Sequence, residues 1–181
     1  MNIAAHYLEE IRRQMRAYKR LADGALAQIS QEEFFRELDP ESNSIAIVVK
    51  HIAGNMRSRF TNFLTTDGEK PDRNRDQEFE VGTADRATFL SEWELGWKIV
   101  FDTLDTLTPE DVERVVTIRG EPHTVLQALS RALAHYAMHI GQIIYLAKHL
   151  RSEQWNTLSV PRGKTDEFNA KMREKHSGPT T

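Results

Sequence analysis

The sequence predicts an all-α fold, a four-helix bundle with a long crossover between its second and third helices and a small hairpin before the fourth. Apolar residues recur every three or four positions over four long segments, which is the period of a helix that buries one face. Each segment spans about 22 to 28 residues, and helices of that length with one apolar stripe pack as a bundle. A long polar connection in the middle of the chain allows the crossover.

The first two helices are expected at residues 2–29 and 42–64. In the first segment, the apolar series begins with Ile3, Tyr7 and Ile11 and continues at the same spacing. The second segment follows a proline, and the serines and the asparagine at 42–44 are residue types that cap helix N-termini. Both segments are therefore expected to pack by one apolar face.

The third helix is expected at residues 85–107, after a connection that is too polar and too broken to be helical. Residues 65–74 are polar and contain Gly68 and Pro71, a composition that indicates a long loop. The third helix is expected to stop before Pro109, because proline cannot continue a helix.

The fourth helix is expected at residues 124–150, preceded by a hairpin within residues 113–125. β-branched residues stand on both sides of Arg119 and Gly120, which is the pattern of two short strands joined by a tight turn. Two strands alone are barely stable, so we expect this hairpin to lean on the bundle.

We expect one bundle domain, residues 1–154, and a C-terminal extension, residues 155–181, which packs on the bundle and whose end can be disordered. The extension contains an irregular stretch and then a short helix near residues 166–175. A chain of 181 residues is long enough to bury a real core as one domain.

Three histidines form the strongest candidate site in the sequence. His135 and His139 are four residues apart on the fourth helix, so both imidazoles lie on one face, close enough to bind one metal ion. His51 lies near the middle of the second helix, at the edge of its apolar stripe. His135 and His139 lie at the edge of the apolar stripe of the fourth helix in the same way. If the two helices are neighbours, the three nitrogens form a metal site with an open position. The alternative is that they are half-buried histidines bonded to their neighbours.

Polar residues near this triad are candidates for contacts with a substrate. Asn55 follows His51 by four residues and Gln142 follows His139 by three, so both can face the same pocket. Arg162, in the C-terminal extension, could close the pocket and bind an anion, although a Pro-Arg-Gly stretch is more often only a turn. The remaining four histidines are weaker candidates.

Composition excludes several classes of protein. The chain has no cysteine, which rules out disulfides, thiolate metal sites and a protein-borne cysteine nucleophile. A net charge of −3 with scattered basic residues gives no footprint for nucleic acid, and no apolar run is long enough to span a membrane. No Glu-x-x-His pair, HExxH motif or glycine-rich phosphate loop is present. We expect a cytoplasmic protein.

The residues around His51, together with the stretch from His135 to Ile143, resemble the DinB-like superfamily over essentially residues 1–150. The extension from Leu158 to Gly163 resembles one uncharacterised branch of it. The resemblance implies an up-down-down-up bundle, one divalent metal on His51, His135 and His139, and frequently a homodimer. Characterised relatives include transferases that join a thiol such as bacillithiol or mycothiol to an electrophile, and thiol-dependent isomerases.

Three functions stay open from the sequence. The first is a metal-dependent transferase that takes a small-molecule thiol and an electrophile as partners. The second is a metal-binding bundle without turnover that acts in a stress response, and the third is a metal-dependent hydrolase. Histidine ligands suit zinc, nickel, iron and manganese alike, so the metal stays open as well.

Overall fold

The computed structural model describes residues 2–177 and is mostly helical, so the prediction of an all-α fold is confirmed. None of the described helices combines the length and apolarity needed to cross a membrane. The α-helices are α1 (Ile3–Leu26), α2 (Gln31–Phe35), α3 (Ile45–Phe60), α4 (Arg86–Thr106), α5 (Val125–Arg151) and α6 (Thr165–His176). The remaining elements are the strands β1 (Val115–Ile118) and β2 (Glu121–Thr124) and the 3-10 turns η1 (Asp76–Phe79), η2 (Pro109–Asp111) and η3 (Ser152–Gln154).

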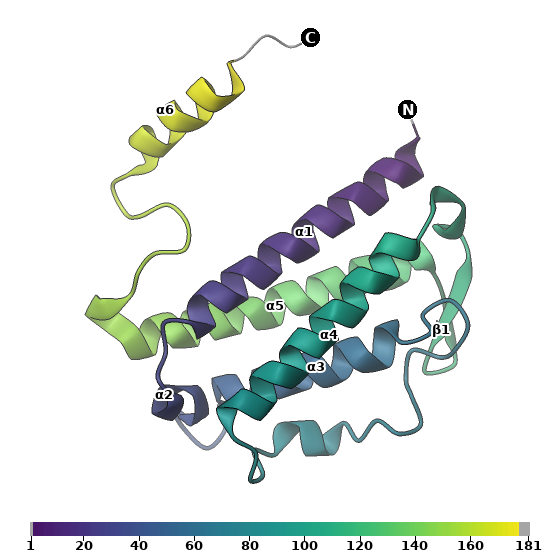
Figure 1. The fold of residues 1–181 in the computed structure, drawn as a ribbon, viewed down its shortest axis with the longest axis horizontal. Coiled ribbons are helices and arrows are strands. Elements are labelled where there is room, and N and C mark those ends of the chain that lie inside the picture. The colour runs from purple at the N-terminus through teal and green to yellow at the C-terminus, as the bar shows by residue number, and fades with distance from the viewer. Residues whose placement is uncertain (1, 178–181) are drawn as a thin grey trace.

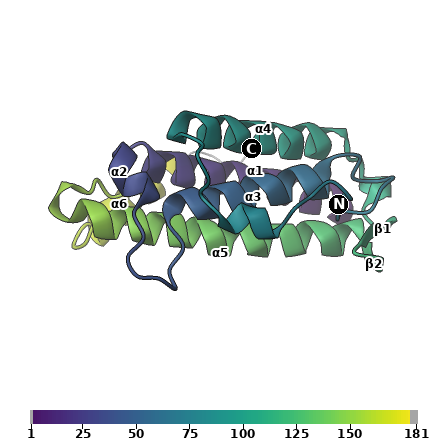
Figure 2. The same cartoon turned by 90° about the horizontal axis from the view of Figure 1, so that it is seen from below.

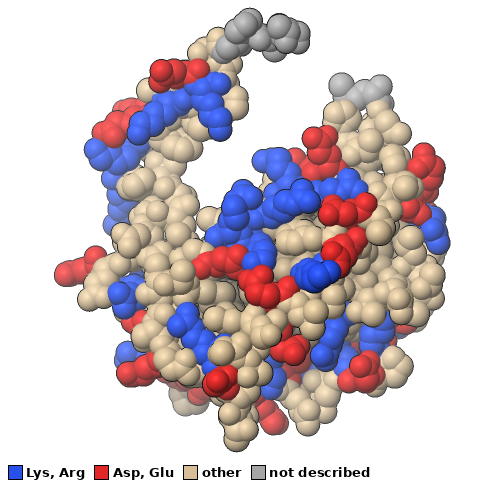
Figure 3. Space-filling view, in the orientation of Figure 1, with Lys and Arg blue, Asp and Glu red and all other residues tan. Residues whose placement is uncertain are grey.

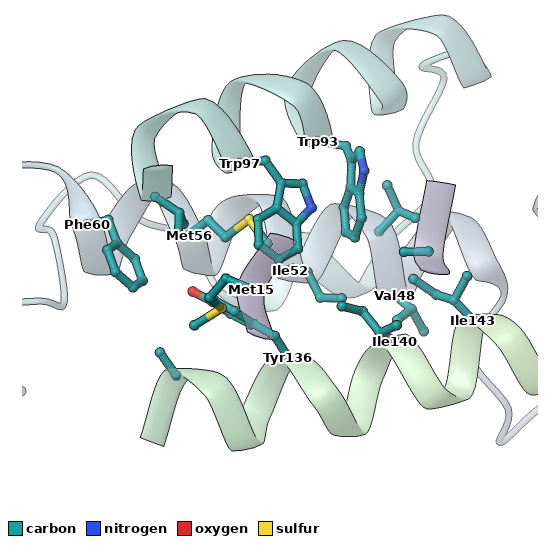
Figure 4. Packing of buried hydrophobic residues seen from close by; sticks show 14 of the residues in the cluster. Met15, Val48, Ile52, Met56, Phe60, Trp93, Trp97, Tyr136, Ile140 and Ile143 are labelled. Atoms are coloured by element: carbon teal, nitrogen blue, oxygen red, sulfur yellow. The ribbon is translucent and has the colours of Figure 1, made fainter. Parts of the chain in front are cut away.

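The four long helices lie side by side, with α3 packed against both α4 and α5, and α1 packed against α5 (Figures 1 and 2). Their shared core is built from large apolar side chains of every long helix (Figure 4). Trp93 and Trp97 of α4 and Tyr136 of α5 are among the largest fully buried side chains. Tyr136 therefore fixes how α5 is rotated towards the core.

Residues 61–85 connect α3 to α4 by running back along α3 (Figure 1). Within this connection, η1 contacts α3 and lies across it (Figure 2). A loop was predicted for residues 65–74, and the turn η1 that follows it was not predicted; η1 places side chains of the connection on the surface of α3.

The predicted hairpin is present, with β1 and β2 paired antiparallel and Ile118 opposite Glu121. Arg119 and Gly120 form its turn, and both have positive φ, 58° and 76°. Tight hairpins favour this conformation because it matches the twist of the strands. The turn is fixed to the long connection, because the backbone N–H groups of Arg119 and Gly120 donate to Asp67 at 2.8 Å each.

The helix boundaries differ from the expected ones by a few residues. The second predicted helix, 42–64, begins at Ile45 behind its cap Ser44 and ends at Phe60. Asn62 has a positive φ of 51°, so the chain has left the helix before Leu64. The short helix α2 was not predicted, although Ser30 caps it in a capping box, which is a pattern readable from sequence.

The C-terminal extension contacts the bundle at its beginning, where Trp155 and Leu158 pack against the core. Helix α6 buries no residue, and it stands apart from the bundle in Figure 1. The packing of the whole 155–181 extension therefore stays a prediction, and its expected disorder falls partly on residues 178–181, outside the described residues.

Basic and acidic side chains are intermixed over the face drawn in Figure 3.

Candidate metal centre

Helices α3 and α5 bring the three predicted histidines together. Nε2 of His135 lies 3.3 Å from Nε2 of His51 and 3.1 Å from Nε2 of His139. Within residues 2–177, this triad is the group of potential ligands whose atoms all lie within 4.8 Å of one another. His51 is buried, and the two α5 histidines are half-buried. The two α5 histidines are thus more accessible to solvent than His51.

The core beneath the triad fixes the two helices in register. Tyr136, next to His135, donates its hydroxyl hydrogen bond to Asn55 Oδ1 at 3.1 Å, one turn after His51 on α3. Burial raises the pKa of Tyr136 far above its usual value, so the hydroxyl stays protonated as a donor. This buried hydrogen bond links α5 to α3 next to His135 and one turn from His51.

Hydrogen bonds on the outer nitrogens orient two of the three rings. Nδ1 of His51 donates to Glu78 Oε2 at 2.9 Å, and Nδ1 of His139 donates to Gln142 Oε1 at 2.8 Å. Ligating histidines in metal sites are held in this way, because a bond on one ring nitrogen fixes the tautomer and directs the other nitrogen to the metal.

With these tautomers, hydrogen bonds cannot satisfy all three inward-facing nitrogens. A neutral histidine with its proton on Nδ1 has only a lone pair on Nε2, so His51 and His139 both direct lone pairs inward. Nε2 of His135 can donate a hydrogen bond to one of them at most. A divalent cation accepts all three lone pairs at once, which hydrogen bonding among the three rings cannot do.

The spacing of the nitrogens also fits a metal. Two nitrogens about 2.0–2.1 Å from one tetrahedral zinc lie about 3.3 Å apart. The observed separations of 3.3 Å and 3.1 Å between Nε2 atoms agree with that value. The donor set and its geometry therefore fit a divalent metal with three protein ligands.

Glu78 is the functional residue that sequence reasoning missed. It is buried on η1, where its two oxygens accept a forked hydrogen bond from Arg73 Nε and Nη2, each at 2.8 Å. The side chain of Arg73 is only 4% exposed. Arg73 thus positions the carboxylate of Glu78, which in turn orients the ring of His51.

Glycine in the middle of α3 makes room for this carboxylate. A Cβ on Gly54 would lie 2.3 Å from Glu78 Oε1, a distance that no side chain tolerates. A glycine inside a predicted helix indicates a close approach, so Gly54, three residues after His51, was the one sequence signal for a neighbour here. Glu78 itself, in a loop 27 residues away, gave none.

Burial and neighbouring charges shift the ionisation of the site towards metal binding. Burial raises the pKa of Glu78, but hydrogen bonds from His51 and Arg73 and the charge of Arg73 outweigh it, so its pKa is lowered. Burial, and then the charges of His139 and His51, lower the pKa of His135 to about 4. Burial also lowers the pKa of His139. Glu78 is therefore ionised and His135 neutral at pH 7, the forms that a metal site requires.

The other predicted residues fall in different places. Asn55 lines the cavity beside the triad, and Gln142 is exposed and bonds His139. Arg162 is exposed in the extension and does not line the cavity, so its role stays a prediction.

Comparison with known proteins gives one family. Residues 2–164 match a family described as a protein of unknown function (DUF1572). None of the curated proteins matches the sequence.

Glu78→Gln should weaken metal binding about 10- to 100-fold, as loss of an outer carboxylate partner typically does. Gly54→Ala should act in the same direction, because it displaces Glu78 without removing it. Zinc affinity measured by competition with a chromophoric chelator checks both. Glu80→Gln, two residues away and exposed, is the control, and equal affinities in all three variants would contradict the role of Glu78.

His135 should also make the metal-free protein less stable in acid. Its pKa is lowered from 6.5 to about 4 in the folded chain. Between pH 6.5 and about pH 4 the unfolded chain binds a proton that the folded chain does not, so the free energy of unfolding falls as the pH drops through this range. Urea unfolding at pH 7 and pH 5 should show a smaller loss in His135→Gln than in the wild type. An unchanged loss in His135→Gln, equal to that in His149→Gln, would contradict this.

Proposed function

Because the chain belongs to the DUF1572 family, a DinB-like family, we propose that it is a metal-dependent enzyme that joins a low-molecular-weight thiol to an electrophile. The proposal has two parts, a divalent metal on His51, His135 and His139, and a reaction at that metal. The carrying observation is that the triad borders a cavity of about 200 Å³, which His51 and His135 both line.

The outer shell supports an open site rather than a closed one. Glu78 and Gln142 are occupied in bonding the outer nitrogens of His51 and His139, so neither is free to be a fourth ligand. Among the residues that line the cavity there is no cysteine, aspartate or glutamate. Three protein ligands with a free position is the pattern of catalytic metal sites.

A thiol that reacts at this site would have to be a cosubstrate, because the chain contains no cysteine. Any sulfur nucleophile must then arrive from outside, and no protein thiol competes for the electrophile. A divalent cation, when bound, favours the thiolate form of a thiol, and the thiolate is the form that attacks.

The chain's own residues position the reaction. Arg73 holds Glu78, and Glu78 holds the ring of His51. Gln142 orients the ring of His139, and the hydrogen bond between Tyr136 and Asn55 fixes α5 relative to α3 beside the triad. Four apolar residues also line the cavity and would keep water away from bound reactants: Phe63, Val116, Ile118 and Ala132.

The test uses zinc-loaded or nickel-loaded protein with several small thiols and a chlorinated dinitrobenzene. A carbon–sulfur bond forms as the carbon–chlorine bond breaks, chloride leaves, and the thiol proton passes to the buffer. We expect His135→Ala to lose at least tenfold in rate while its helical circular dichroism is unchanged. Chloride release and absorbance of the thioether measure the reaction.

His149→Ala is the matched control, because His149 lies on the same helix but is exposed and away from the triad. It should retain the wild-type rate. Equal rates for the wild type and His135→Ala with every thiol would contradict the transferase proposal.

A further inference from the structure

The cavity beside the triad is lined by an unusual number of arginines. It lies between α3, α5, the hairpin and the connection after α3. None of its lining residues is acidic, and five of them are arginine: Arg59, Arg73, Arg75, Arg119 and Arg131. Guanidinium groups converging on a cavity are the usual means of binding carboxylate or phosphate.

Nearby carboxylates neutralise only part of this charge. Glu78 pairs with Arg73. Glu69 is shared, since its Oε2 lies 3.0 Å from Arg59, 3.3 Å from Arg73 and 3.1 Å from Arg119. Three of the five arginines thus share two carboxylates, whereas Arg75 and Arg131 have no ion-pair partner within residues 2–177.

Arg59 is paired with Glu69 through Nη2, but one of its other hydrogen-bond donors is left without a partner. Its Nη1 is buried and has no hydrogen-bond partner among the described residues. Burial lowers the pKa of Arg59, and the charges of Arg73 and Arg119 lower it further against the effect of Glu69. A buried donor without an acceptor destabilises the folded chain, and an anion in the cavity would supply the acceptor.

Arg119 is held at the cavity by a strained turn. Its φ is 58°, in the left-handed region where asparagine or glycine is the usual residue of such a turn. Asp67 accepts hydrogen bonds from the backbone of Arg119 and Gly120, so the turn cannot relax away. Strain of this kind clusters at binding sites, where a side chain has to be presented in one place.

These observations share one explanation, which rests on the proposed function and deepens it. We propose that the cavity binds one reactant as a small organic anion, whose carboxylate or phosphate is held by Arg59, Arg119 and Arg131. Its apolar part lies against Phe63, Val116 and Ile118, which line the same cavity. The anion is thereby placed beside His51 and His135, which line the same cavity.

Calorimetric titration tests this with matched probes. Phenylpropionate and phenyl phosphate should bind at least tenfold more tightly than phenylpropanol, which has the same apolar body as phenylpropionate but no charge. Each is titrated into metal-loaded protein and into protein treated with EDTA, where no ion is left to bind the anion. Affinity should persist without metal and fall as salt is raised.

Arginine variants locate the site. Arg119→Gln and Arg131→Gln should each weaken binding of phenylpropionate at least fivefold in the EDTA-treated protein. Arg114→Gln is the matched control, because its side chain is 51% exposed against 53% for Arg119 and it does not line the cavity. Equal affinity for the alcohol and the acid, or an equal loss in Arg114→Gln, would overturn the proposal.

The two proposals fail separately. Anion binding that needs the metal and ignores the arginine variants would overturn the anion site and leave the metal centre standing. Arginine-dependent binding without any thiol transfer would keep the anion site and overturn only the reaction.

Repeating the titration with mercaptopropionate and with a chloronitrobenzoate shows which reactant is the anion. The thiol is the anion if only the binding of mercaptopropionate depends on Arg131, and the acceptor is the anion if only the binding of the chloronitrobenzoate does. Arginine dependence in neither would count against the proposal.

Discussion

The convergence of three imidazole nitrogens between α3 and α5 is the constraint that organises this molecule. Nε2 of His135 lies 3.3 Å from Nε2 of His51 and 3.1 Å from Nε2 of His139, and a hydrogen bond from His135 can satisfy only one of these two contacts. The hydrophobic core and the buried bond from Tyr136 to Asn55 hold the helices where the rings must meet. The packed bundle thus keeps the three candidate ligands together, and a metal bound there would in turn stabilise the folded chain.

The connection between α3 and α4 is part of the site. Three of its residues form hydrogen bonds there: Glu78 with His51, Arg73 with Glu78, and Asp67 with the backbone of the hairpin turn. Loops that carry function on a rigid scaffold are common, and here the scaffold accommodates the loop through Gly54 on α3. The metal centre and the arginine-lined cavity consequently share one support: displacing the connection would disturb both.

Sequence alone was enough for the parts of this structure that depend on local periodicity. The four long helices, the hairpin turn and the position of the three histidines at the rims of two apolar stripes all follow from spacing along the chain. Glu78 and the arginines of the cavity come from separate segments that meet only in the fold, and no short-range pattern marks them. The helix α2 was missed for a different reason, since its capping box was readable at Ser30 and Glu33. For Arg162 the sequence suggested a contact that the described cavity does not show.

X-ray absorption spectroscopy of the zinc-loaded protein tests the central claim most directly, because it reports the atoms bound to the metal. One zinc per chain should show three imidazole nitrogens at about 2.0–2.1 Å and one exchangeable light-atom ligand. A shell of water oxygens alone, or a fourth ligand from the protein, would contradict an open three-histidine centre.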